Sequence, residues 1–156
     1  MAVTWTSARI TPCKQFGLNT HPTLHVAKAS ATTCTKGDLI VLSAGLGVVN
    51  NDDPTAAPVV GIASETITAA QAKLAVAVYP AIAGQLFEGT FVGVFAQADL
   101  GTSYDIDDSK GYPAVERTTT AVCVVPVALK NRDAAVGDTD VRIYFKFIPA
   151  ALVGLG

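Results

Sequence analysis

The most suggestive chemical pattern in the chain is a run of oxygen-bearing side chains that ends at Glu116. Oxygen ligands fall at positions 1, 3, 5 and 12 of a calcium-binding loop: Asp105, Asp107, Ser109 and Glu116. That spacing lets carboxylates converge on one hard cation. The sharp turn of such a loop needs glycine at position 6, where this chain has Lys110, and no helical pattern flanks the run. We therefore predict a polar β-turn here rather than a metal site.

A string of cysteine and histidine residues near the N-terminus has the composition of a zinc site. The spacing is C-x7-H-x3-H-x8-C, formed by Cys13, His21, His25 and Cys34. Thiolate and imidazole are the ligands that zinc prefers, but the closely spaced cysteine pair of most structural zinc sites is missing. We therefore predict exposed or interface histidines, with no metal and no cofactor.

No nucleophile stands in a recognisable catalytic setting. The segment Ser43-Ala44-Gly45 lacks the leading glycine of a nucleophile elbow. The segment Gly45-Leu46-Gly47 precedes an asparagine-rich loop instead of opening a helix around a phosphate. A thiolate pair of Cys13 with His21 or His25 remains, but nothing in the sequence brings these side chains together. We predict that the chain is not an enzyme.

The composition indicates one folded domain with few charges. The chain has 156 residues, of which 50% are hydrophobic and 15% charged, and its net charge is -2. This balance excludes intrinsic disorder, and the lack of a basic excess argues against nucleic-acid binding. The longest charge-free run, 74–87, contains Pro80 and Gly84 and is shorter than the roughly 20 apolar residues of a membrane span. Residues 1–12 do not show a signal-peptide pattern, so we expect synthesis in a cytoplasm and no membrane association.

The low charge also bears on association and on the cysteines. Alanine, threonine and valine take surface positions that lysine and glutamate usually cover, which favours burial against other copies or another protein. The alternative is a monomer that is simply rich in alanine and threonine. The odd number of cysteines, Cys13, Cys34 and Cys123, favours reduced buried thiols, although one Cys13–Cys34 bridge stays open.

Residues 1–35 are predicted to form an extended N-terminal arm. The segment is rich in threonine and proline, which disfavour helix interiors, and its apolar residues follow no regular period. We expect four of these residues to be anchors for another protein's pockets: Trp5, Ile10, Phe16 and Leu24. For Trp5 and Phe16, the alternative is that the arm folds back and these side chains cap the core of the protein itself.

Residues 36–156 are predicted to form an all-β body, a small antiparallel barrel or sandwich that folds without the arm. Short apolar runs between turn residues predict strands at 39–42, 48–49, 59–63, 74–79, 86–95, 104–106, 112–115, 122–129 and 141–148. The last run alternates Val141, Ile143, Phe145 and Phe147 with other side chains, the period of a half-buried strand. Residues 67–73 are the one stretch with a helical pattern, and it is barely two turns long.

Several motifs of the body occur in an order that carries a resemblance. They are GDLIV at 37–41, VVGIASE at 59–65, EGTF at 88–91, ADLGTSYDI at 98–106 and GDTDVRIYF at 137–145. In this order the chain resembles the tailed-phage capsid decoration or cement (head) proteins, over roughly residues 36–148. Residues 1–35 have no match in that family.

The resemblance implies a virion structural protein without catalytic residues. Such a protein binds the outside of the phage head and stabilises it by bridging copies of the major capsid protein. The resemblance also implies a homo-oligomer, a trimer at a symmetry axis, located on the capsid surface after synthesis in the host cytoplasm. An extended arm suits this role because it can reach across a subunit boundary.

Two other functions remain open at this point. One is a tail-tube or head-completion subunit, which would form rings in solution. The other is a surface carbohydrate-binding β-module, which needs clustered exposed aromatic side chains. The chain has one Trp and four Tyr, spread along its length, which argues against the carbohydrate module.

Overall fold

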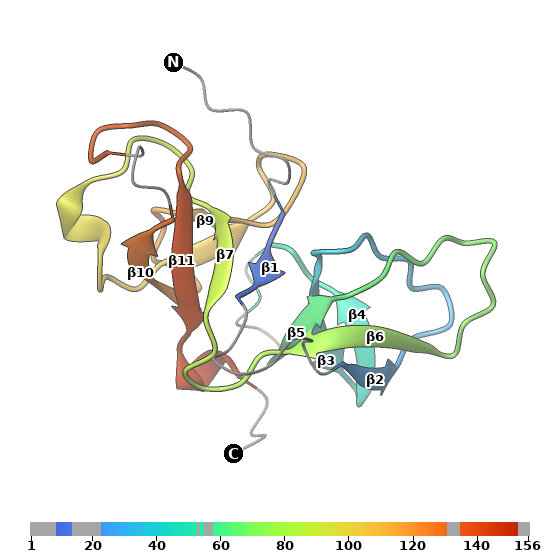
Figure 1. Cartoon of the computed structure of the whole chain (residues 1–156). Coiled ribbons are helices and arrows are strands. Elements are labelled where there is room, and N and C mark those ends of the chain that lie inside the picture. Colours follow the sequence, from blue (N-terminus) through green and yellow to red (C-terminus); the bar gives the residue numbers. More distant parts are fainter. Residues whose placement is uncertain (1–8, 14–22, 53, 55–57, 131–134, 153–156) are drawn as a thin grey trace.

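The computed structural model describes residues 9–13, 23–52, 54, 58–130 and 135–152, and it confirms the predicted all-β class. Figure 1 shows the arrangement of the strands. Their bounds are β1 Thr11–Pro12, β2 Leu24–Ala27, β3 Leu39–Ser43, β4 Leu46–Val49, β5 Val59–Ala63, β6 Ala75–Pro80, β7 Phe87–Thr90, β8 Asp105–Asp107, β9 Ala114–Glu116, β10 Val124–Leu129 and β11 Arg142–Phe147. The described residues also include two short 3-10 turns, η2 at Gln97–Asp99 and η3 at Pro149–Ala151.

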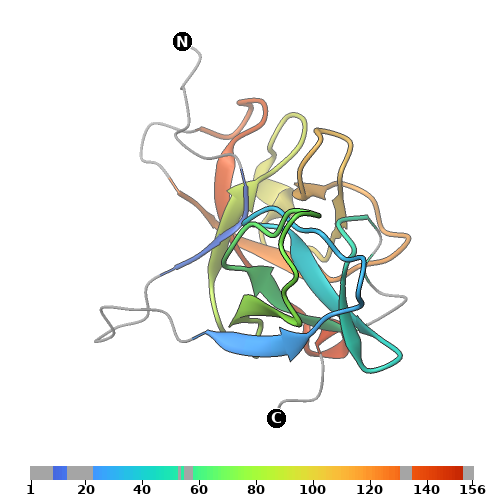
Figure 2. The same ribbon diagram turned by 90° about the vertical axis from the view of Figure 1, so that its right-hand side faces the viewer.

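The strands form two antiparallel sheets and a separate hairpin. The first sheet has the order β1-β7-β11-β10, the second has the order β2-β6-β5-β3-β4, and β8 pairs with β9. In Figure 1 the two sheets form neighbouring groups with β1 between them, and Figure 2 looks onto the second sheet. The second sheet curls until Lys28 meets Gly47 in one parallel bridge, so β2 and β4 touch without a continuous ladder.

Strands β3 and β5 are buried on both faces. Leu39 and Val41 of β3 belong to the main hydrophobic cluster, which they share with the phenylalanines of the first sheet. Ile40, between them in sequence, belongs to the second cluster, which fills the inside of the curled sheet. Since successive side chains of a strand point to opposite faces, the continuous apolar run of β3 supplies both clusters.

Strand β5 shares this double burial through a β-bulge. Ile40 pairs with Gly61 and Val41 pairs with Val59, so Val60 is the extra residue in the ladder. The bulge places Val59 and Ile62, three positions apart, in the main cluster. Without the bulge, residues three positions apart in a strand would point to opposite faces; the one-residue register change brings both side chains to the same face.

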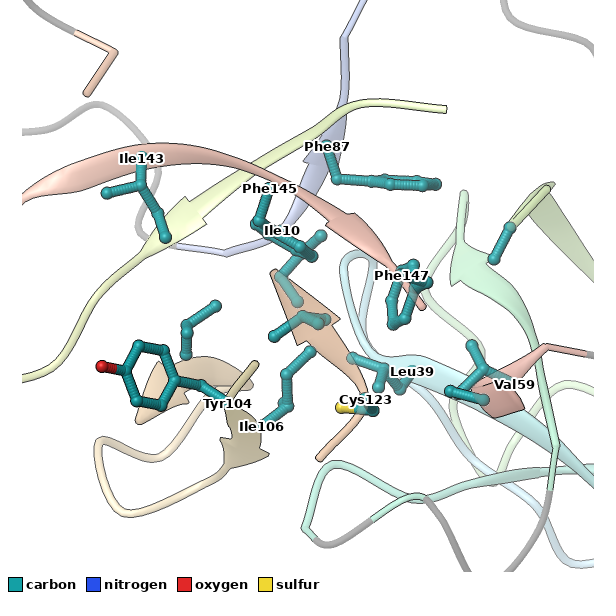
Figure 3. Packing of buried hydrophobic residues seen from close by; sticks show 14 of the residues in the cluster. Ile10, Leu39, Val59, Phe87, Tyr104, Ile106, Cys123, Ile143, Phe145 and Phe147 are labelled. Atoms are coloured by element: carbon teal, nitrogen blue, oxygen red, sulfur yellow. The ribbon is translucent and has the colours of Figure 1, made fainter. Parts of the chain in front are cut away.

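The main cluster lies between the two sheets. Phe87, Phe145 and Phe147 of the first sheet contact one another there, with ring centroids 5.4–6.1 Å apart. Figure 3 shows Phe145 and Phe147 facing Leu39 and Val59 of the second sheet across this cluster. The alternating pattern of the last strand thus marks its core face, as expected.

The described part of residues 1–35 belongs to both sheets. Thr11 and Pro12 pair with β7, and residues 24–27 pair with β6. Ile10 is 1% exposed and lies in the main cluster, while the guanidinium of Arg9 binds Asp38 at the start of β3, at 2.6 Å. These contacts join the N-terminal segment to the body at its core.

Residues 67–73 do not form the helix that their pattern suggests. Ile67 instead pairs with Cys34 through two backbone hydrogen bonds of 2.8 and 3.1 Å. The Ile67 side chain is buried in the second cluster, and the backbone N–H of Gln71 closes a turn on the carbonyl of Thr68. Packing of one β-branched side chain therefore overrides a weak helical preference.

The run at 86–95 is also shorter than its apolar residues suggest. Strand β7 ends at Thr90, and Gly93 has φ +84°, a conformation that turns the chain. Phe91 then leaves the sheet and forms an isolated bridge with Val115.

A first prediction concerns Gly61, where β5 and β6 approach closely. A Cβ atom at this position would lie 2.2 Å from the carbonyl oxygen of Tyr79. We expect Gly61→Ala to lower the free energy of unfolding by about 3 kcal/mol, measured by urea denaturation. Gly84→Ala is the control: its site has φ +83° and open space, so it should cost about 1 kcal/mol. Equal losses in the two variants would contradict the close approach.

A second prediction tests how firmly residues 1–35 are joined to the body. Ile10→Ala removes a core side chain and should lower the free energy of unfolding by about 3 kcal/mol. Leu24→Ala changes a side chain that is 43% exposed and should cost less than about 1 kcal/mol. Thermal and urea unfolding of both variants measure the difference. An Ile10→Ala variant as stable as the parent chain would show that the segment does not share the core.

Candidate functional site

A groove runs along the outer face of the first sheet. The strand register places Thr11 opposite Glu88, and Glu88 opposite Tyr144, so these side chains form a row across three strands. Pro12, Cys13 and Leu86 complete the lining of the groove, whose volume is about 490 Å³. The groove therefore combines a polar floor with an apolar edge.

Arg142 is the most deeply buried charge beside this groove. Its side chain is 1% exposed and donates to the Glu88 carboxylate at 3.1 Å, the Arg9 carbonyl at 3.2 Å and the Thr90 hydroxyl at 3.4 Å. Lys130 Nζ also binds Glu88, at 2.9 Å. A buried guanidinium is tolerable only when it is paired in this way. Glu88 thus neutralises one fixed charge and ties three strands and the N-terminal segment together.

The charge state of Glu88 follows from these contacts. Burial alone would raise its pKa, but hydrogen bonds from Lys130 and Arg142 outweigh burial and hold the pKa below the usual glutamate value. Glu88 is therefore ionised at neutral pH and cannot serve as a general acid there. Glu88, Lys130 and Arg142 therefore have a structural role: they hold neighbouring strands of the first sheet together.

The cysteines do not form a reactive centre among the described residues. Burial, reinforced by the Glu88 charge, raises the pKa of the Cys13 thiol to about 11, so it is protonated at neutral pH. All three cysteines are free, so the Cys13–Cys34 bridge is not formed, and Cys34 and Cys123 are buried as predicted. His25 is exposed on β2 of the second sheet, and His21 lies outside the described residues.

The acidic run that resembles a calcium loop is a β-hairpin with the predicted turn. Asp107 Oδ1 accepts from the Ser109 backbone N–H at 2.5 Å, and Gly111 has φ +75°. Asp105 points inward, where its carboxylate accepts backbone hydrogen bonds from Ile106 and Ala121. In the part of the chain described by the structure, no three Cys, His, Asp or Glu side chains gather closely enough to hold a metal ion.

A second polar cluster surrounds Asp99, which is 3% exposed. Its carboxylate accepts from the Tyr104 hydroxyl at 2.6 Å, from Arg117 at 2.5 Å and from the Ala96 backbone N–H at 2.6 Å. Arg117 also lies over the Phe91 ring, 5.4 Å from its centroid. Both carboxylate oxygens of Asp99 accept hydrogen bonds that hold η2 and the residue after β9, Arg117, in place. This cluster therefore has a structural role as well.

The four predicted anchor residues have different fates. Ile10 is a buried residue of the main cluster, so at this position the N-terminal segment folds onto the body. Leu24 is exposed at the start of β2. Trp5 and Phe16 lie outside the described residues.

Exposed apolar side chains are the remaining surface feature. The described residues with large apolar side chains at the surface are Leu24, Leu46, Leu74, Ile82, Leu86, Val94, Val127 and Val136. Leu74 is the extreme case, at 88% exposure. Leu74 lies opposite Lys28, whose backbone N–H donates to the Leu74 carbonyl. Leu46 precedes Gly47, the bridge partner of Lys28, and therefore points to the other face of the sheet. The exposed apolar side chains are thus spread over several elements of the described chain.

Sequence reasoning missed Arg142 and its partners. The alternation of β11 places Arg142 on the outer face, where a charged residue is ordinarily solvated. The signal that would have found the pair is the register of β7 against β11, which no local pattern contains.

The comparisons add no relative. No family model, no curated protein and no solved structure matches the chain. Among the described residues, no helix has the length and apolar character needed to cross a membrane.

A third prediction concerns Glu88. Glu88→Gln leaves the buried Arg142 charge without its counter-ion and should lower the free energy of unfolding at pH 7 by about 2–3 kcal/mol. Because folding lowers the Glu88 pKa, its stabilisation is present above the ordinary glutamate pKa and is lost as the pH falls through the folded value. When the free energy of unfolding is measured by urea denaturation at about pH 6 and at about pH 3, the variant should therefore lose less stability between the two pH values than the parent chain.

The control for this prediction is Glu65→Gln. Glu65 pairs with Lys73 at the surface, so this variant should cost less than about 1 kcal/mol. A Glu88→Gln variant with the stability of Glu65→Gln would show that Glu88 does not carry the Arg142 charge.

Proposed function

We propose that the chain is a virion structural protein, a capsid cement or decoration protein of a tailed phage. It binds the outside of the head and bridges copies of the major capsid protein. The observation that carries the proposal is the series of large apolar side chains exposed among the described residues, Leu74 above all, on a chain with only 15% charged residues. Apolar surface of this kind is typical of a face that another protein covers.

The polar clusters support a structural role rather than a chemical one. Glu88, Asp99 and Asp105 are each engaged in hydrogen bonds that hold strands or turns. No described side-chain nitrogen or oxygen that is fully buried lacks a partner, so none is held ready for a ligand. The Cys13 thiol, with its raised pKa, is a poor nucleophile at neutral pH.

The proposal includes partners and a location. The chain forms a homo-oligomer, a trimer, and its partner is the major capsid protein at the outer surface of the head. Contacts of modest size suffice, because many copies on one shell raise the effective concentration of each contact. Nucleic acid and membranes are not partners.

The test is sedimentation of the purified chain with empty shells assembled from the major capsid protein, together with light scattering of the chain alone. We expect saturable co-sedimentation, and a solution mass three times the 16.1 kDa of one chain. Shells that sediment without the chain would refute the proposal. Rings of larger mass would favour a tail-tube or head-completion subunit instead.

A further inference from the structure

Among the described residues, the outer side of β2 is an open sheet edge. Lys28 donates its backbone N–H to Leu74 on the β6 side, at 3.1 Å, whereas Ala29 donates to Gly47 on the β4 side, at 3.3 Å. Because backbone groups of a strand alternate between its two neighbours, His25 directs its N–H and C=O to the β4 side. Strand β4 begins at Leu46, beside Lys28, and no described residue is in register with His25 on that side.

This edge lacks the usual protection against pairing. At the edge of the first sheet, Cys13 donates to Leu86, so Pro12 is the residue that faces outward, and it has no N–H to offer. Strand β2 has no proline. Its neighbour Lys28 is 8% exposed, with its ammonium bound to the carbonyls of Ala29 and Ser30 instead of guarding the edge.

The edge is apolar as well as open. Leu24 shares a strand face with Val26, which packs against the second hydrophobic cluster. Leu24 extends that cluster to the end of the strand, where 43% of the side chain stays exposed. A strand laid beside His25 would cover Leu24 and continue the curled sheet at the place where its ladder is open.

We propose that the open edge of β2 docks a short extended segment of the capsid shell protein, which adds a strand beside His25. This inference rests on the proposed function and names the part of the chain that makes the contact. Backbone hydrogen bonds give such a contact its register, and an apolar side chain of the incoming segment covers Leu24. The segment is short because Gly47 occupies the same side of the strand from Lys28 onward.

The length of the edge favours the shell over a second copy of the chain. Within β2 only His25 and Ala27 face this side, and Ala27 lies next to the Gly47 bridge. So short an edge offers far less than the roughly 1,000 Å² of buried surface that a stable pair of free molecules needs. On a shell, the same short pairing is repeated at many sites and adds to the other contacts of each copy.

The experiment compares His25→Pro with His25→Thr in co-sedimentation with shells. Proline removes the outward N–H without touching the ladder to β6, whereas threonine keeps the N–H and suits a strand. We expect the proline variant to bind shells about tenfold more weakly than the parent chain, and the threonine variant to bind like the parent. Circular dichroism and the melting temperature report whether each variant is folded.

A second measurement covers the case in which the proline variant does not fold. Hydrogen exchange of the His25 amide in the unmodified chain should be fast in solution and at least tenfold slower on shells. The Ala77 amide, which binds the Glu65 side chain within the sheet, is the internal reference and should not change.

The outcomes separate this inference from the proposed function. A parent chain that binds shells together with an equally tight proline variant, or an unprotected His25 amide on shells, overturns the inference and leaves the function standing. A parent chain that does not bind shells overturns the function. A proline variant whose solution mass falls without shells identifies a second copy as the occupant and overturns the assignment to the shell.

Discussion

The structure depends on the burial of β3 and β5 on both faces. Their side chains alternate between the main cluster, shared with the first sheet, and the second cluster, inside the curled second sheet. Both clusters contain side chains of these two strands, so the core between the sheets and the core inside the second sheet depend on the same strands. The bulge at Val60 and the close approach at Gly61 are the local features that make this double packing possible.

Polar contacts extend the same joint to the N-terminal segment. Arg142 in the first sheet binds the Arg9 carbonyl, and the Arg9 side chain binds Asp38 at the start of β3. Ile10 fills the core between these two contacts. The proposed bridging of shell subunits would require a protein that resists being pulled apart, and two sheets that pack on one core through β3 and β5 are consistent with that proposal. In the second sheet, β6 lies between β2 and the doubly buried strand β5.

The sequence predicted the strands well because their signals are local. The double-buried runs of β3 and β5 and the alternation of β11 stand out without any knowledge of their partners. The sequence left open whether residues 1–35 extend away from the body or fold back onto it. The union of residues 9–13 with the core depends on contacts distant in sequence, such as Thr11 with Glu88, that no local pattern contains. Arg142 was missed for the same reason. The short helical pattern at 67–73 did not form a helix, because Ile67 is buried and paired with Cys34.

The central claim is that β3 and β5, which are buried on both faces, make the two sheets unfold as a single cooperative unit. Differential scanning calorimetry of the whole chain tests it most directly, by comparing the calorimetric enthalpy with the van't Hoff enthalpy of unfolding. The account predicts one transition in which the two enthalpies agree. Two resolved transitions, or a calorimetric enthalpy well above the van't Hoff value, would show that the sheets unfold independently and would contradict the claim.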